Sequence, residues 1–128
     1  MSQKTPAQIL GTRGEELAAE YLENKGYTIL EKNFTVHKIG EIDLIVKKGD
    51  EIIFVEVKTR TGIRYGYPEE AVNYWKVKKI SRAARHFLHT RNIHDTYIRF
   101  DIVSVYIQEE DEKNDILHTE NISLSLDC

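Results

Sequence analysis

Residues 51–60 read EIIFVEVKTR, and this apolar stretch decides the fold of the chain. β-Branched and aromatic side chains dominate it, which predicts a central and largely buried strand. Side chains two residues apart on a strand share a face. Glu56 and Lys58 therefore point the same way from a buried sheet, where an isolated charge is costly. The pattern indicates either a structural ion pair or a functional site.

The preceding segment, EIDLIV at residues 41–46, predicts a second strand. Its alternation places Glu41 and Asp43 on one face and the apolar residues 42, 44 and 46 on the other. A turn around Gly49 would join the two strands as a hairpin, with Asp43 opposite residues 54–56. Directly opposed Cβ atoms lie about 4.5–5.5 Å apart. Asp43 and Glu56 would then converge beside Lys58, in a pocket suited to a hard divalent cation.

These residues resemble a known signature. Asp43, a hairpin and then Glu56-Val57-Lys58 resemble the PD-(D/E)xK motif of restriction-endonuclease-like nucleases, with Ile42 where the motif has proline. The longer strings, GEIDLI at 40–45 and FVEVKTR at 54–60, resemble the YraN-type family of small bacterial proteins, which is similar to archaeal Holliday-junction resolvases. Matching flanking positions extend this resemblance from about residue 12 to residue 106.

The resemblance implies a metal-dependent endonuclease that hydrolyses DNA phosphodiester bonds, including those of branched or junction DNA. Asp43 and Glu56 would hold Mg²⁺, or Mn²⁺ in its place. The backbone carbonyl of Val57 and the carboxylate of Glu15 would complete the metal site. Lys58 would orient the attacking water, help to deprotonate it and stabilise the transition state. The expected catalytic residues are Glu15, Asp43, Glu56 and Lys58.

Glu15 belongs to a predicted helix that begins with Thr12 as its N-cap and ends at Gly26. Helical periodicity places Glu15 at the border of the apolar stripe and Glu16 toward solvent. Glu15 is then either the capping-box partner of Thr12 or, as the resemblance implies, a further carboxylate of the site. The stripe consists of Leu17, Ala18, Tyr21 and Leu22.

The expected fold class is α/β: a restriction-endonuclease-like α/β/α sandwich around a mixed sheet of about five strands. The predicted strands are residues 27–36, 41–46, 51–60, 99–107 and 116–118. The first helix should cover one face, and a long helix from Pro68 to about Thr90 the other. Arg99 and Asp101 share a strand face and are predicted to form an ion pair. One domain should span residues 1–128, with a core at about 12–107 and an acidic part at 108–128 that ends in mobile residues.

Charge is unevenly distributed along the chain. The net charge is −3, yet residues 57–91 hold nine basic and two acidic side chains. Local fields rather than net charge attract a polyanion, so this block predicts a DNA-binding surface. The alternative is an ordinary solvated helix face. The candidate phosphate-binding residues are Arg60, Arg64, Lys76, Lys79 and Arg82.

Several classes of protein are disfavoured by composition. The only cysteine is Cys128, which excludes an internal disulfide framework and a thiolate zinc site. No apolar run approaches the ~20 residues that span a membrane. Residues 1–10 lack the apolar region of a secretory signal, so we expect a cytoplasmic protein. No glycine-rich phosphate loop and no zinc-type histidine spacing is present.

Two other interpretations compete with a nuclease. The chain could be a nucleic-acid-binding protein that retains the fold without catalysis, or Asp43, Glu56 and Lys58 could form a structural ion cluster. Two carboxylates against one lysine leave surplus negative charge, which calls for a cation or a raised pKa. This imbalance favours a site. Resolution of a DNA junction would further require a homodimer, because two strands must be cut.

Overall fold

The computed structural model describes residues 3–61, 74–108 and 114–122, with the backbone alone for residues 74–77. Five strands form one sheet in the order β1-β2-β3-β4-β5. The strands are β1 (Thr28–Val36), β2 (Gly40–Lys48), β3 (Glu51–Thr61), β4 (Tyr97–Ile107) and β5 (Asn114–Thr119). The helices are α1 (Pro6–Asn24) and α2 (Tyr74–Thr90). No helix among the described residues is both long and apolar enough to cross a membrane.

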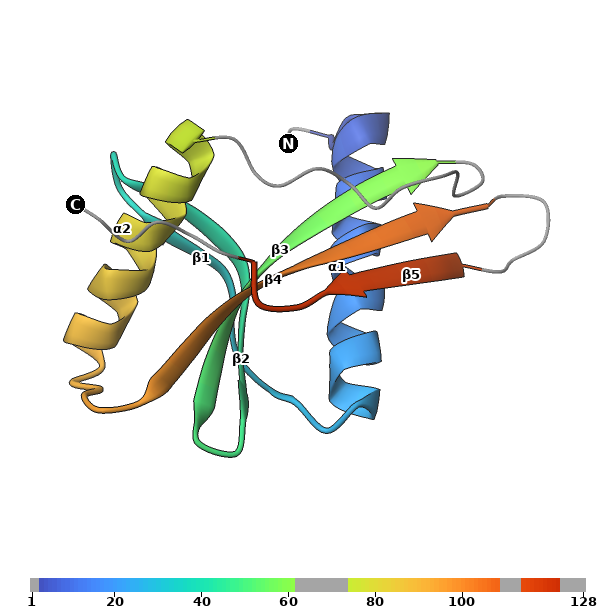
Figure 1. Ribbon diagram of the computed structural model, residues 1–128. Helices are drawn as coiled ribbons and strands as arrows, with labels where there is room; N and C mark the ends of the chain where they lie inside the picture. Colours follow the sequence, from blue (N-terminus) through green and yellow to red (C-terminus); the bar gives the residue numbers. More distant parts are fainter. Residues whose placement is uncertain (1–2, 62–73, 109–113, 123–128) are drawn as a thin grey trace.

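The sheet is mixed, and the two helices lie on opposite faces of it. β3 and β4 are parallel, while the other neighbouring pairs are antiparallel. Figure 1 shows the twisted sheet between α1 and α2, with β3, β4 and β5 running alongside α1 and with β1 and β2 curving toward α2. This arrangement confirms the predicted α/β/α architecture. The turn at Gly49, which adopts a φ of 60°, also lies where the sequence predicts it.

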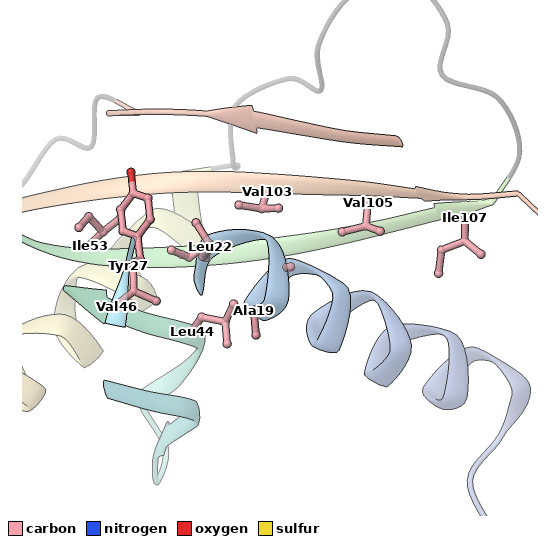
Figure 2. Close-up of a cluster of buried hydrophobic side chains, with 11 residues drawn as sticks. Ala19, Leu22, Tyr27, Leu44, Val46, Ile53, Val103, Val105 and Ile107 are labelled. Atoms are coloured by element: carbon pink, nitrogen blue, oxygen red, sulfur yellow. The ribbon is translucent and has the colours of Figure 1, made fainter. Parts of the chain in front are cut away.

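Two apolar clusters hold the layers together. On the α1 side, Leu22 and Ala18 are completely buried against the sheet, and Figure 2 shows Leu22 among valines of β2 and β4. On the α2 side, Phe87 is completely buried and makes edge-to-face contacts with Phe34 and Phe54. Burial of apolar side chains of this size contributes roughly 1.5–3 kcal/mol each. β2 and β3 contribute to both clusters, so the candidate site lies on the best-packed part of the sheet.

The start of α1 differs from the prediction. The N-cap is Thr5, whose Oγ1 accepts a hydrogen bond from the backbone N–H of Gln8 at 3.1 Å. The side chain of Gln8 in turn accepts from the backbone N–H of Thr5 at 2.8 Å. This capping box and Pro6 at the first turn begin the helix seven residues before Thr12, so the predicted N-cap at Thr12 is wrong. Glu15 therefore lies in the interior of the helix and has no capping role.

α1 approaches the sheet most closely at Gly14. A Cβ atom on Gly14 would lie 2.0 Å from Thr59 Oγ1 and 2.9 Å from Thr59 Cβ. Only a residue without a side chain allows the helix to pack directly on β3 at this point. This close approach also places the next residue, Glu15, beside the sheet.

We predict opposite stability effects for two glycine-to-alanine changes in α1. Gly14→Ala should lower the free energy of unfolding by about 1–2 kcal/mol, because overpacking against Thr59 costs more than helix propensity gains. Gly11→Ala should raise it by about 0.5–1 kcal/mol, since no atom lies within 4 Å of the added Cβ. Urea denaturation of the two variants checks both signs. Equal effects of the two changes would contradict the close packing of α1 on β3.

A polar network on the α1 side ties β4 to its surroundings. Asp101 is 2% exposed and accepts hydrogen bonds from Arg99 Nε at 2.9 Å and from Arg99 Nη2 at 3.0 Å. His118 Nε2 at 2.7 Å and the backbone N–H of Asn121 at 2.9 Å also donate to it. Arg99 further contacts Glu51 and the hydroxyl of Tyr27. The predicted ion pair of Arg99 with Asp101 is thus confirmed as part of a larger structural network.

Candidate active site

The sheet opens between β2 and β3, and Asp43 lies at the opening. Antiparallel pairing of the two strands runs from Lys48↔Glu51 to Leu44↔Val55. β3 continues in register with β4 as far as Thr61. Just past the last pair, Asp43 Oδ2 accepts a hydrogen bond from the backbone N–H of Val57 at 2.8 Å. The side chain of Asp43 therefore takes the place of a backbone acceptor where the two strands separate.

The predicted alternation of β2 fails at Asp43. Leu44 and Val46 share a face and belong to the apolar cluster on the α1 side. Ile42 instead belongs to the cluster on the α2 side. The irregularity coincides with Asn33 on β1, which lies between the pairs Lys32↔Leu44 and Phe34↔Ile42 and has a φ of 51°. A residue in the left-handed conformation within a strand changes the direction in which the neighbouring side chains point. The effect is to turn Asp43 toward the α1 side.

Three carboxylates gather on that side. Oxygens of Glu15, Glu41 and Asp43 all lie within 4.8 Å of one another, a spacing at which one metal ion could be held. Glu15 comes from α1, and the other two come from the start of β2. Glu15 is half-buried and Glu16 is exposed, as the helical periodicity predicts. The structure thus brings Glu15 and Asp43 together as expected, and it adds Glu41.

Burial and the neighbouring carboxylates both shift the protonation of Asp43. Burial is the main cause that raises the pKa of Asp43 to about 7, and the charges of Glu15, Glu56 and Glu41 raise it further. The hydrogen bond from Val57 opposes this shift. Burial likewise raises the pKa of Glu15, against a hydrogen bond from Asn33. Burial and like charges both favour the protonated form of Asp43, and a bound divalent cation would favour the ionised form instead.

Glu56 and Lys58 occupy adjacent positions on one face of β3. Glu56 is 8% exposed, and Lys58 is partly buried two residues later. β3 alternates regularly, with Phe54 in the cluster beneath α2 and with Val55 and Val57 on the α1 side. Glu56 and Lys58 therefore share the face of Phe54, on the α2 side, whereas Glu15, Glu41 and Asp43 gather on the α1 side, so the predicted convergence of Asp43 and Glu56 on one face is not seen. The charge of Glu56 reaches Asp43 across the opening, since it contributes to the pKa shift of Asp43.

Three of the predicted phosphate-binding residues, Lys76, Lys79 and Arg82, belong to α2, and Arg60 belongs to β3. Lys79 is exposed, and a Cβ atom on Gly40 would lie 3.2 Å from its Cβ, so α2 crosses the start of β2 close to Asp43. Arg82 is exposed and follows Lys79 by three residues, on the same side of the helix. Arg60 is exposed near the end of β3. Arg64 and the side chain of Lys76 lie outside the described residues.

A second group of potential ligands is structural. Among the described residues, Asp101, His118 and Glu120 also lie within 4.8 Å of one another. The guanidinium of Arg99 already neutralises this group, because it contacts Asp101 at 2.9 Å and Glu120 at 3.1 Å. The opening beside Asp43 is therefore the better candidate for a metal.

The sequence pattern did not identify Glu41 and Asn33 as site residues. Glu41 had one signal, since it lies two residues before Asp43 on the same predicted face. Asn33 had its residue type, because asparagine is among the few residues that tolerate a positive φ, and it is one of the flanking positions that match the resembled family. Neither signal identifies a site residue unless the position of α1 on the sheet is also known.

Together the mixed sheet between two helices and the motif residues at its opening define a protein of the restriction-endonuclease-like, PD-(D/E)xK type. A search of family models matches residues 14–105 to the uncharacterised protein family UPF0102. The chain belongs to this family, which is the YraN family that its sequence resembles.

Relatives that carry the family name in two bacteria are similar along most of their length. The UPF0102 protein of Clostridioides difficile is 51% identical over 100 residues, which cover 78% of this chain and 87% of the relative. The UPF0102 protein of Acetivibrio thermocellus is 42% identical over 121 residues, which cover 94% of this chain and 91% of the relative. Neither name assigns an activity.

Proposed function

We propose that this protein is a metal-dependent endonuclease that hydrolyses phosphodiester bonds of DNA. The observation that carries the proposal is the position of Asp43, at a break in the sheet where carboxylate oxygens of Glu15 and Glu41 lie within 4.8 Å of its own. Burial raises the pKa of Asp43 to about 7, and the charges of Glu15, Glu56 and Glu41 raise it further, so a bound divalent cation would favour its ionised form.

The donor set fits a hard divalent cation. All of its side-chain donors are carboxylate oxygens, which Mg²⁺ and Mn²⁺ prefer. Asp43 and Glu56 would hold the ion, with Glu15 and the backbone carbonyl of Val57 as further ligands. When bound, Mg²⁺ supplies Lewis-acid polarisation of the phosphoryl oxygen and lowers the pKa of a water ligand.

The basic residues have separate roles in this proposal. Lys58 orients the attacking water, assists its deprotonation and stabilises the negative charge that develops on the phosphoryl group. Lys79, Arg82 and Arg60 bind the phosphates that flank the scissile bond. Lys79 supports this role by geometry, since its backbone lies beside the start of β2, three residues before Asp43.

We propose DNA with exposed or bent strands, such as a branched junction, as the substrate, which is what the resemblance to junction resolvases implies. The site lies where the pairing of β2 with β3 ends, and Lys79 of α2 packs beside Gly40 at the start of β2. Cutting both strands of a junction requires two such sites, so we propose that the active form is a homodimer.

Cleavage assays test the proposal. Plasmid, single-stranded and branched DNA should be cut in the presence of Mg²⁺ or Mn²⁺ and should remain intact with a chelator. Lys58→Met and Glu56→Gln should each lower the cleavage rate at least about 100-fold, because both act on transition-state charge. Lys47→Met is the matched control: Lys47 is exposed at the other end of β2, and its loss should leave the rate unchanged.

Each result of these assays has a direct meaning. Equal rates for wild type and Glu56→Gln would contradict the proposed site. Salt-sensitive binding of DNA without cleavage under either metal would instead show a nucleic-acid-binding protein that lacks catalysis.

A further inference from the structure

Asn33 lies beside the candidate site, in a backbone conformation that few residues tolerate. Its φ of 51° falls within β1, on the segment that faces Asp43 between two backbone pairs of β1 and β2. Residues other than glycine rarely adopt this region, and asparagine is among those that do. A left-handed residue within a strand has a local structural cost, which is typical of positions that serve a site.

The side chain of Asn33 lies between two of the three clustered carboxylates. Its amide nitrogen donates to Glu15 Oε1 at 3.1 Å and to Glu41 Oε1 at 3.0 Å. The partners determine this orientation of the amide, because an ionised carboxylate can only accept hydrogen bonds. One neutral NH₂ group therefore satisfies two anionic acceptors that come from different elements, α1 and β2.

The two hydrogen bonds oppose a repulsion. Glu15 and Glu41 are like charges close to each other, and without a shared donor each would turn away to a better-solvated position. A hydrogen bond from a neutral donor holds a carboxylate in place without cancelling its charge, which a lysine or arginine would do. The carboxylates therefore stay negatively charged, as cation binding requires, while the hydrogen bonds hold them in position.

We propose that Asn33 is a positioning residue that holds Glu15 and Glu41 together and directs them toward Asp43. The inference rests on the proposed function, and it extends that function by assigning Glu41 to the metal site and Asn33 to its supporting shell. Residues that orient metal ligands through hydrogen bonds change metal affinity when they are replaced, without contacting the ion themselves.

The test is the affinity for Mn²⁺ of Asn33→Gly, measured by calorimetry. Glycine accepts a φ of 51° without strain, so this change removes the amide and leaves the backbone free to keep its conformation. We expect a roughly 10- to 100-fold weaker affinity, the range that is typical when a residue that hydrogen-bonds to metal ligands is replaced. Asn92→Gly is the matched control, because Asn92 has a φ of 54° in the turn after α2 and should bind Mn²⁺ like the wild type.

A double-mutant cycle with Glu41→Gln separates positioning from general structural support. If Asn33 acts by holding Glu41, Asn33→Gly should weaken Mn²⁺ binding much less in the Glu41→Gln background than in the wild type. Additive effects, or wild-type affinity in Asn33→Gly, would overturn the inference and leave the nuclease proposal intact. A wild-type protein that binds no Mn²⁺, alone or with a non-cleavable DNA, would overturn both.

Discussion

Asp43→Asn should stabilise the metal-free protein while it abolishes metal-dependent cleavage. Asparagine keeps an acceptor for the backbone N–H of Val57, so the hydrogen bond at the opening is retained. The change removes one of several crowded carboxylates at a buried position. We expect the free energy of unfolding at about pH 8 to rise by on the order of 2–4 kcal/mol.

The pH dependence of this effect has a definite sign. The pKa of Asp43 is about 7 in the folded protein and lower, near its ordinary 3.8, in the unfolded chain. The folded state therefore binds the proton more tightly, and ionisation of Asp43 weakens the fold as pH rises from about 4 to 7. The stabilisation by Asp43→Asn should be complete above this window and should disappear below about pH 4.

Urea denaturation in the presence of a chelator, at several pH values, measures the effect. Asp50→Asn is the matched control: Asp50 is exposed in the turn between β2 and β3, and its replacement should change stability by less than about 0.5 kcal/mol. A pH-independent loss of stability in Asp43→Asn would show that the carboxylate is a structural element. Such a trade of stability for function is common at active sites.

Asp101→Ala should cause one of the large losses of stability among single changes in the described residues. Its side chain is completely buried and accepts four hydrogen bonds, and the change leaves Arg99 Nε and His118 Nε2 without this acceptor. Breaking a buried charge network by removing one member costs about 3–5 kcal/mol. Asp115→Ala, an exposed aspartate on β5, should cost less than about 1 kcal/mol.

Lowering the pH should remove the stabilisation that the network around Asp101 provides. Burial alone would raise the pKa of Asp101, but hydrogen bonds from His118 and Arg99 hold that pKa below its ordinary value. The stabilisation by Asp101 is thus present above about pH 4 and is lost as pH falls through the lowered pKa. A denaturation series between about pH 7 and pH 2 on wild type and Asp101→Ala should show the two stabilities converging in acid. If the free energies of unfolding of the two proteins stayed equally far apart at every pH, this stabilising role of the Asp101 carboxylate would be contradicted.

The central strand and its hairpin partner could be predicted because their signals are local. β3 needs only its own β-branched residues, and the hairpin needs only Gly49 between two apolar runs. The spacing from Asp43 to Glu56 then follows from the register of a short turn. The periodicity of α1 also separates Glu15 from Glu16 correctly.

Other features depend on contacts that are distant in sequence. The kink at Asp43 arises where Asn33 on the neighbouring strand takes a left-handed conformation, and alternation along β2 alone predicts the wrong face for Ile42. The cluster of Glu15 with Glu41 requires α1 to pack on β3 where Gly14 meets Thr59. The start of α1 was predicted too late, although Thr5 and Gln8 carry a capping signal of their own.

The most direct test of a metal site is a calorimetric titration of Mn²⁺ into the wild-type protein and into the double variant Asp43→Ala/Glu56→Ala. Circular dichroism verifies that the variant is folded. The wild type should bind Mn²⁺, and this binding should disappear in the variant. Equal binding by the two proteins, or no binding by the wild type even with a non-cleavable DNA present, would contradict the proposed metal site.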